Sequence, residues 1–280
     1  MSDPLVTTEW LAAGLGRADL QVVDATWYMP GEEGSGAADY AAGHIPGAVF
    51  FDIDAIADHD TDLPHMLPSA EAFAAAAGRL GLRRDATVVV YDARGIFSAP
   101  RVWWTLRAMA FPHVFVLDGG LKRWRAEGRP LDTAPPTAKP SELAPRLTPA
   151  LVRNLDQMKG LVANGSAQVV DARNAPRFRG EAGEPRPGVR SGHMPGALNL
   201  PWGELVRGDG TLKTEAEVRA AFEAAGVDLA RPIVTTCGSG VTAALLALGL
   251  ARLGRGDVPV YDGSWTEWGG RAETPVVAGP

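Results

Sequence analysis

The sequence is poor in cysteine, because Cys237 is the single cysteine among 280 residues. One cysteine excludes an intramolecular disulfide and any cysteine-cluster zinc or iron–sulfur site. It is compatible with a reducing compartment. No pair among the five histidines has metal-ligand spacing. We therefore expect no metal ion, and we expect no organic cofactor either.

The sequence also lacks an excess of basic residues and a long apolar run. Its 27 Lys and Arg against 33 Asp and Glu give a net charge of -6, whereas a general nucleic-acid binder usually has a basic excess. The most apolar stretch, residues 241–251, is about half of the roughly 20 residues that span a bilayer. The first residues lack the basic start and apolar run of a signal peptide. We expect a soluble, cytoplasmic monomer without a nucleic-acid or membrane partner.

Three short motifs occur twice, in the same order and at nearly the same spacing. The pairs are VVDA at 22–25 and 169–172, GHIPGA at 43–48 with GHMPGA at 192–197, and LDGG at 117–120 with YDGS at 261–264. The period is too long for a solenoid, so the pattern indicates a tandem duplication of a domain. We expect domains at 1–128 and 150–280. Six prolines in 129–149 predict an extended linker between them, because proline fixes φ and removes a backbone donor.

Each half alternates short β-branched runs with helical patterns. In the first half we expect strands at 21–23, 87–91 and 114–117, and helices at 69–80, 98–109 and 121–127. In the second half we expect strands at 168–170, 232–236 and 258–261, and helices from Thr214, at 242–253 and at 264–268. Glu217 lies three residues after Thr214, as in a capping box. This order predicts an α/β protein with a parallel sheet in each domain and helices on both faces.

Cys237 lies where such a sheet binds ligands, directly after the strand at 232–236 and before a helix. Gly238 and Gly240 let the backbone curl with its N–H groups turned inward, and the helix N-terminus adds partial positive charge. Both effects favour the thiolate over the thiol, so Cys237 is a candidate nucleophile. Ser239 is a candidate hydroxyl for proton relay. The alternatives are an inert, buried cysteine and a phosphate cradle in which the thiol is incidental.

The duplication provides an internal comparison for this loop. Aligning the strand at 88–91 with that at 233–236 places Asp92 opposite Cys237, so the first half has no sulfur nucleophile. We interpret the first half as a catalytically inactive scaffold that closes the pocket. A cysteine phosphatase would need an arginine at the end of the loop, but its Cys-x5-Arg pattern falls on Ala243.

Three segments together resemble a known family. They are Tyr40-x3-HIPGA at 40–48, the active-loop sequence CGSGVT at 237–242, and V-x2-YDGSW-x-EW at 258–268. The chain resembles the tandem-domain rhodanese family over its whole length, and within that family the 3-mercaptopyruvate sulfurtransferases. The fold that the resemblance implies is two tandem rhodanese-like domains.

The resemblance also implies a substrate-binding set. Thiosulfate-preferring members carry basic residues just after the cysteine, whereas Gly238, Ser239 and Gly240 are neutral here. In the mercaptopyruvate branch, the arginines that match Arg177 and Arg186 hold the carboxylate and keto oxygens of the substrate, and a guanidinium suits a planar carboxylate. With Arg179 and Arg190 they would form a basic pocket. The loop residues assigned to substrate binding are Gly238, Gly240, Val241 and Thr242.

The activity that the resemblance implies is sulfur transfer through a Cys237 persulfide. Sulfur would pass from 3-mercaptopyruvate, with release of pyruvate, to cyanide or to a dithiol such as thioredoxin. Two alternatives remain open: a thiosulfate:cyanide sulfurtransferase and a non-catalytic sulfur-carrier module.

The histidines of the repeated motifs favour a structural role. Each half contains one of the two matching histidines, His44 or His193, although one half alone has a nucleophile. His65 lies in a stretch that resembles a family segment near the domain interface, and it is a weaker candidate for the pocket lining.

Overall fold

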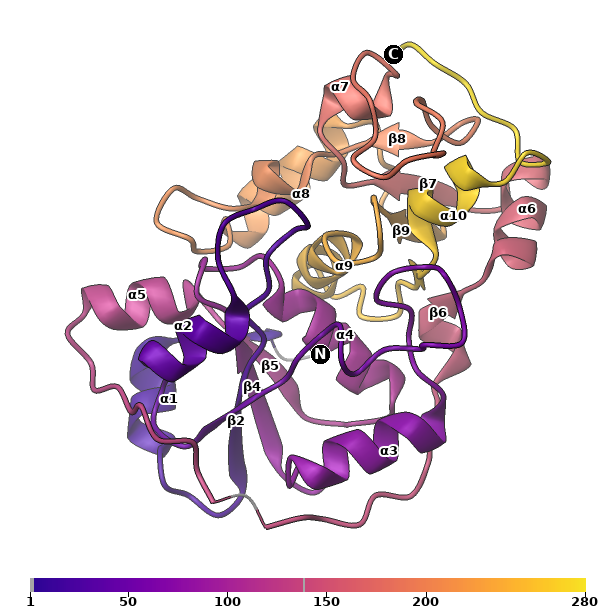
Figure 1. The fold of residues 1–280 in the computed structure, drawn as a ribbon. Helices are drawn as coiled ribbons and strands as arrows, with labels where there is room; N and C mark the ends of the chain where they lie inside the picture. Colours follow the sequence, from indigo (N-terminus) through magenta and orange to yellow (C-terminus); the bar gives the residue numbers. More distant parts are fainter. Residues whose placement is uncertain (1–2, 138) are drawn as a thin grey trace.

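The computed structural model describes residues 3–137 and 139–280, which form two domains that lie against each other (Figure 1). Each domain contains a five-stranded, all-parallel sheet. The strand orders are β1-β5-β4-β2-β3 and β6-β10-β9-β7-β8, so the second sheet repeats the order of the first. The predicted α/β fold with parallel sheets is confirmed.

The first domain alternates strands and helices. Its elements are β1 (Leu5–Val6), α1 (Thr8–Gly14), β2 (Leu20–Asp24), α2 (Gly36–Ala42), β3 (Ala48–Phe50), α3 (Ala70–Arg79), β4 (Thr87–Tyr91), α4 (Ala99–Ala108), β5 (Val114–Leu117) and α5 (Gly120–Ala126). Side chains along β4 alternate between two apolar layers, because successive strand residues point to opposite faces. Val89 packs with α1, α2 and α5, whereas Val88 and Val90 pack with α3 and α4.

The second domain has the same plan with two additional 3₁₀ turns. Its elements are η1 (Pro149–Leu151), β6 (Val152–Arg153), α6 (Leu155–Asn164), β7 (Gln168–Asp171), α7 (Ala175–Phe178), β8 (Leu198–Asn199), η2 (Trp202–Leu205), α8 (Glu215–Ala224), β9 (Ile233–Thr236), α9 (Ala243–Arg252), β10 (Val260–Tyr261) and α10 (Ser264–Gly270). The predicted capping box is present: Thr214 accepts from the N–H of Glu217, whose carboxylate accepts from the N–H of Thr214.

Helices α4 and α9 pack against each other between the two sheets (Figure 1). Nearly every residue of both helices is buried. A single apolar cluster runs from Val88 and Val90 through α4 and α9 to Val170 and Ile233 of the second sheet. The two domains therefore share one hydrophobic core.

The proline-rich segment 129–149 runs along the first domain without a helix or strand among its described residues, as far as η1. It is anchored by backbone hydrogen bonds. The N–H of Ser141 donates to the carbonyl of Gly78 at 2.9 Å, and the N–H of Thr148 donates to that of Ala108 at 2.7 Å. The segment is thus extended but fixed to the surface of one domain. Within the described residues, no helix has the length and apolar character to cross a membrane.

Candidate active site

Cys237 lies at the carboxyl end of β9, which β10 and β7 flank in the second sheet. The residue is 2% exposed, yet it lines a cavity of about 420 Å³ between the domains. The first domain contributes Trp27, Met29 and Phe97 to the wall, among others. The rings of Phe97 and Trp202 meet across the domain boundary, with centroids 5.1 Å apart. The first domain therefore closes this cavity.

Helix α10 holds the cysteine loop by its backbone. The N–H of Trp265 donates to the carbonyl of Cys237 at 2.9 Å, and the N–H and hydroxyl of Thr266 donate to the carbonyl of Gly238 at 2.9 and 2.7 Å. The N–H of Cys237 donates to the Ser264 hydroxyl at 3.3 Å. Ser264 was not among the residues predicted for the site, although it belongs to the repeated YDGS motif.

The sulfur of Cys237 accepts a hydrogen bond from the loop that follows it. The N–H of Gly240 donates to Sγ at 3.1 Å, and Gly240 adopts a φ of 83°. That left-handed conformation is strained for residues with a side chain, which explains the glycine. The predicted inward turn of the loop is present, with one amide donor on the sulfur within the described residues.

Three arginines of the second domain line the cavity, and two of them are neutralised. Arg173 is paired with Asp171 at 2.7 Å and with Glu184 at 2.8 Å. Arg177 is paired with the other oxygen of Glu184 at 2.5 Å. Burial lowers the pKa of Arg173, but the two carboxylates outweigh burial and raise it.

Arg186 is the cation left over from this set, with no hydrogen-bond partner among the described residues. Burial lowers the pKa of its guanidinium, and the nearby Cys237 acts in the opposite direction, because a thiolate favours the charged guanidinium. Arginine remains protonated after such shifts. The cavity that Cys237 lines therefore also presents a positive charge.

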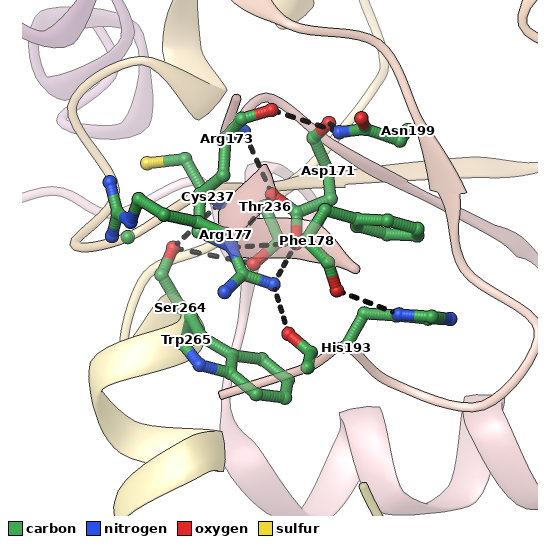
Figure 2. A network of polar contacts seen from close by, with 12 residues as sticks. Asp171, Arg173, Arg177, Phe178, His193, Asn199, Thr236, Cys237, Ser264 and Trp265 are labelled. Atoms are coloured by element: carbon green, nitrogen blue, oxygen red, sulfur yellow. Dashed lines mark hydrogen bonds and ion pairs between the residues drawn. The ribbon is translucent and has the colours of Figure 1, made fainter. Parts of the chain in front are cut away.

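Figure 2 shows how the buried part of this network is built. Arg173 lies over the ring of Trp265, with its Cζ 4.2 Å from the ring centroid, and donates to the carbonyl of Gly192 at 2.8 Å. The thiol of Cys237 points away from this buried ion pair (Figure 2). Arg173 was not among the residues predicted for the site, although the repeat distinguishes it: the matching residue after Asp24-Ala25 is Thr26.

Of the four arginines predicted for a basic pocket, two line the cavity and two do not. Arg177 and Arg186 line the cavity. The inclusion of Arg179 and Arg190 in a basic pocket was wrong. Arg179 pairs with Glu181 at the surface at 2.9 Å. Arg190 donates to backbone carbonyls of α10 and the segment after it, including that of Gly269 at 3.0 Å, because its chain turns toward that helix.

Most of the predicted loop residues also line the cavity, namely Gly238, Ser239, Val241 and Thr242. Gly240 does not line it, because its N–H faces the sulfur and its carbonyl faces Arg101 of the first domain. The Ser239 hydroxyl makes no hydrogen bond within the described residues, and the residue is 9% exposed.

The histidines lie outside the cavity lining. Nδ1 of His44 bonds to the carbonyl of Tyr40 at 2.7 Å, and Nδ1 of His193 bonds to that of Phe178 at 2.9 Å. Each ring also stacks on that same aromatic side chain. The histidines of the two motifs therefore have matching structural roles. Nδ1 of His65 hydrogen-bonds to the carboxylate of Asp54. The ring packs edge-on against Trp27, which lines the cavity, whereas His65 does not.

The family model described as Rhodanese-like domain matches residues 7–127 and again residues 154–271. The chain belongs to the rhodanese family and contains two such domains.

Individual relatives are similar over nearly their full length. The chain is 46% identical over 272 residues to the 3-mercaptopyruvate sulfurtransferase of Escherichia coli K12, covering 97% of this chain and 96% of the relative. It is 43% identical over 274 residues to the human 3-mercaptopyruvate sulfurtransferase, covering 96% and 92%. The crystal structure of SseA from Escherichia coli superposes with a TM-score of 0.86 at 43% identity, covering 93% of this chain and 98% of that one.

Proposed function

We propose that the chain is a sulfurtransferase that takes sulfur from 3-mercaptopyruvate and forms a persulfide on Cys237. The observation that carries the proposal is the position of the thiol in an interdomain cavity whose wall also holds Arg177 and Arg186. 3-Mercaptopyruvate has a carboxylate and a keto oxygen for the two guanidinium groups to bind, and a terminal thiol for the Cys237 sulfur to attack. The family and the names of the relatives support the same reaction.

In the first step, the Cys237 thiolate attacks the sulfur of 3-mercaptopyruvate. A sulfur–sulfur bond forms, the carbon–sulfur bond breaks, and its electron pair moves into the enolate of pyruvate. The proton of the substrate thiol ends on the enolate carbon, so that pyruvate and a Cys237 persulfide anion result. This is covalent catalysis by an activated nucleophile.

The cavity stabilises the charges that this step creates. The N–H of Gly240, 3.1 Å from Sγ, stabilises negative charge on the sulfur, as preorganised donors do in an oxyanion hole. Arg186 is free to hold the carboxylate and the developing enolate oxygen. Arg177 contributes a guanidinium whose charge is partly satisfied by Glu184. Ser239 is the proposed proton relay, since it lines the same cavity two residues after Cys237.

A second nucleophile completes the cycle. Cyanide removes the outer sulfur as thiocyanate and restores the thiolate. A dithiol, such as reduced thioredoxin, attacks the outer sulfur, forms its own disulfide and releases hydrogen sulfide. We propose a cytoplasmic reaction, because the single thiol of the chain must stay reduced to accept sulfur.

The direct test is the mass of the intact protein after incubation with 3-mercaptopyruvate. We expect a gain of one sulfur atom, its loss on addition of cyanide, and one pyruvate released per chain. Cys237→Ser should show neither the gain nor turnover. A mass gain in that variant would contradict the assignment of the nucleophile.

A comparison of kcat/KM for 3-mercaptopyruvate and thiosulfate decides the donor. We expect the keto acid to be preferred, because the loop after Cys237 carries no basic side chain. A preference for thiosulfate would overturn the choice of donor. A persulfide that forms once without turnover would indicate a carrier module.

A further inference from the structure

One buried arginine of the first domain contacts the cysteine loop of the second. Arg101 lies on α4 and is 2% exposed. Its Nη1 donates to the carboxylate of Asp262 at 2.5 Å and to the carbonyl of Gly240 at 3.4 Å. Its Nη2 donates to the carbonyl of His65. A single guanidinium thus joins α4, the 65–67 segment and the loop that carries Cys237.

Gly240 connects this arginine to the sulfur. Its N–H donates to Sγ of Cys237 while its carbonyl accepts from Arg101. The packing around it is tight, since a Cβ built on Gly240 would lie 2.7 Å from Nη1 of Arg101 and 2.9 Å from the carbonyl oxygen of Asp262. A shift of Arg101 would therefore change the position of the amide on the sulfur.

The duplication shows that this contact is a special feature of one half. Asp118 and Asp262 occupy matching positions, and each accepts a backbone N–H from the other domain: that of Leu212 at 2.9 Å and that of Leu67 at 2.6 Å. These two contacts are reciprocal. The contact made by Arg101 has no counterpart in the other direction. Arg101 is the third residue of α4, whereas the third residue of α9 is Leu245.

We infer that Arg101 is a positioning residue, supplied by the inactive domain, that fixes the Gly240 amide against the Cys237 sulfur. The inference rests on the proposed function of Cys237. It gives the first domain a part in the reaction beyond closing the cavity. A buried ion pair is weak evidence for stability, because desolvation opposes the attraction, and in some proteins such pairs serve to fix one conformation.

The test compares Arg101→Lys with Arg107→Lys. Arg107 lies on the same helix, packs its guanidinium on Trp103 at 4.6 Å, as Arg101 packs on Trp104 at 4.6 Å, and donates to the carbonyl of Gly256 in the second domain at 2.8 Å. It makes no contact with the cysteine loop within the described residues. The pair therefore separates domain docking from loop positioning.

Two rates are measured on both folded variants: single-turnover pyruvate release from 3-mercaptopyruvate, and alkylation of Cys237 by iodoacetamide. For Arg101→Lys we expect a fall on the order of tenfold to a hundredfold in kcat and in the single-turnover rate, a slower alkylation, and a KM within about twofold of the wild type, because Arg177 and Arg186 are untouched. Arg107→Lys should match the wild type in both rates.

Equal rates for the two variants would overturn the inference, even if both lose stability. Asp262→Asn provides a second variant should Arg101→Lys fail to fold, and it should show the same loss of kcat. A wild-type protein that releases no pyruvate would instead refute the proposed function, and the alkylation rates would still test the position of the loop.

Discussion

The carboxylate of Asp92 accepts a hydrogen bond from the N–H of Ser98 at 3.0 Å, at the position that Cys237 occupies in the second domain. The same oxygen accepts from the N–H groups of Phe97 and Ala99, each at 2.8 Å. The loop of the first domain therefore forms an anion-binding turn and fills it with its own carboxylate. In the second domain a sulfur stands at the matching position, and it accepts a single N–H, that of Gly240 at 3.1 Å.

Replacing Asp92 tests this structural role. Asp92→Ala leaves three buried N–H groups without their acceptor, and we expect a loss of about 2–4 kcal/mol in the free energy of unfolding. The measurement is urea denaturation, with exposed Asp85→Ala as the control. The folded fraction should retain kcat. A stability equal to that of the control would refute the role.

Replacing the cavity arginines tests substrate binding. Arg186→Lys loses the planar fork and should raise KM for 3-mercaptopyruvate by about tenfold to a hundredfold. Arg177→Lys should have a smaller effect, because Glu184 already engages that guanidinium. Steady-state kinetics measure both. Arg179→Lys, a surface residue paired with Glu181, is the control and should leave KM unchanged.

Adding a methyl group at two glycines should have opposite effects. Gly240→Ala places a Cβ at 2.7 Å from Arg101 at a φ of 83°, so we expect slower formation of the persulfide and a lower melting temperature. Gly160→Ala, in α6 with open space around its Cβ, should stabilise the fold by about 0.5–1 kcal/mol. Single-turnover kinetics and thermal denaturation measure these changes. Normal kinetics in Gly240→Ala would show that the loop tolerates a side chain there.

An acid-sensitive contribution to stability comes from Glu127. Burial raises the pKa of this carboxyl, but the Thr8 hydroxyl, Arg129 and Arg123 outweigh burial and lower it to about 2. Because the pKa is lower in the folded state, its stabilisation is present above about pH 4.5 and is lost as the pH falls toward about 2.

The corresponding variant is Glu127→Gln. We expect it to lower the free energy of unfolding at neutral pH by about 1 kcal/mol, since solvent screens partly exposed pairs, and to flatten the dependence on pH below 4.5. Urea denaturation at several pH values measures both effects. The control is exposed Glu223→Gln; an unchanged pH dependence in Glu127→Gln would contradict the assignment.

The central elements could be predicted because their apolar patterns are strong. The expected strand at 87–91 coincides with β4, and the helix expected at 242–253 corresponds to α9 with its two caps. The strand expected at 258–261 is shorter, because Pro259 lacks the N–H that a ladder needs. The edge strands β1, β6 and β8 have two residues each, too few to show a periodic pattern.

The site was predictable where it is local and not where it depends on packing. Cys237 and its loop follow one strand, so their place at the sheet edge could be inferred from order alone. The sequence does not reveal which arginine finds a carboxylate. Glu184 bridges Arg173 and Arg177, while Arg190 turns toward α10. These pairings depend on the tertiary packing. Arg101 reaches the loop from another domain, so no spacing indicates it.

The apolar layer between α4 and α9 has a consequence for the history of the chain. A duplicated domain that buried its own interior could be lost without unfolding its neighbour. Here the two copies share one apolar cluster, so a chain cut to its second half would expose the apolar side chains of α9 that pack on α4 to water. We therefore expect residues 150–280 alone to be less stable and less soluble than the whole chain, a dependence that would favour retention of both copies.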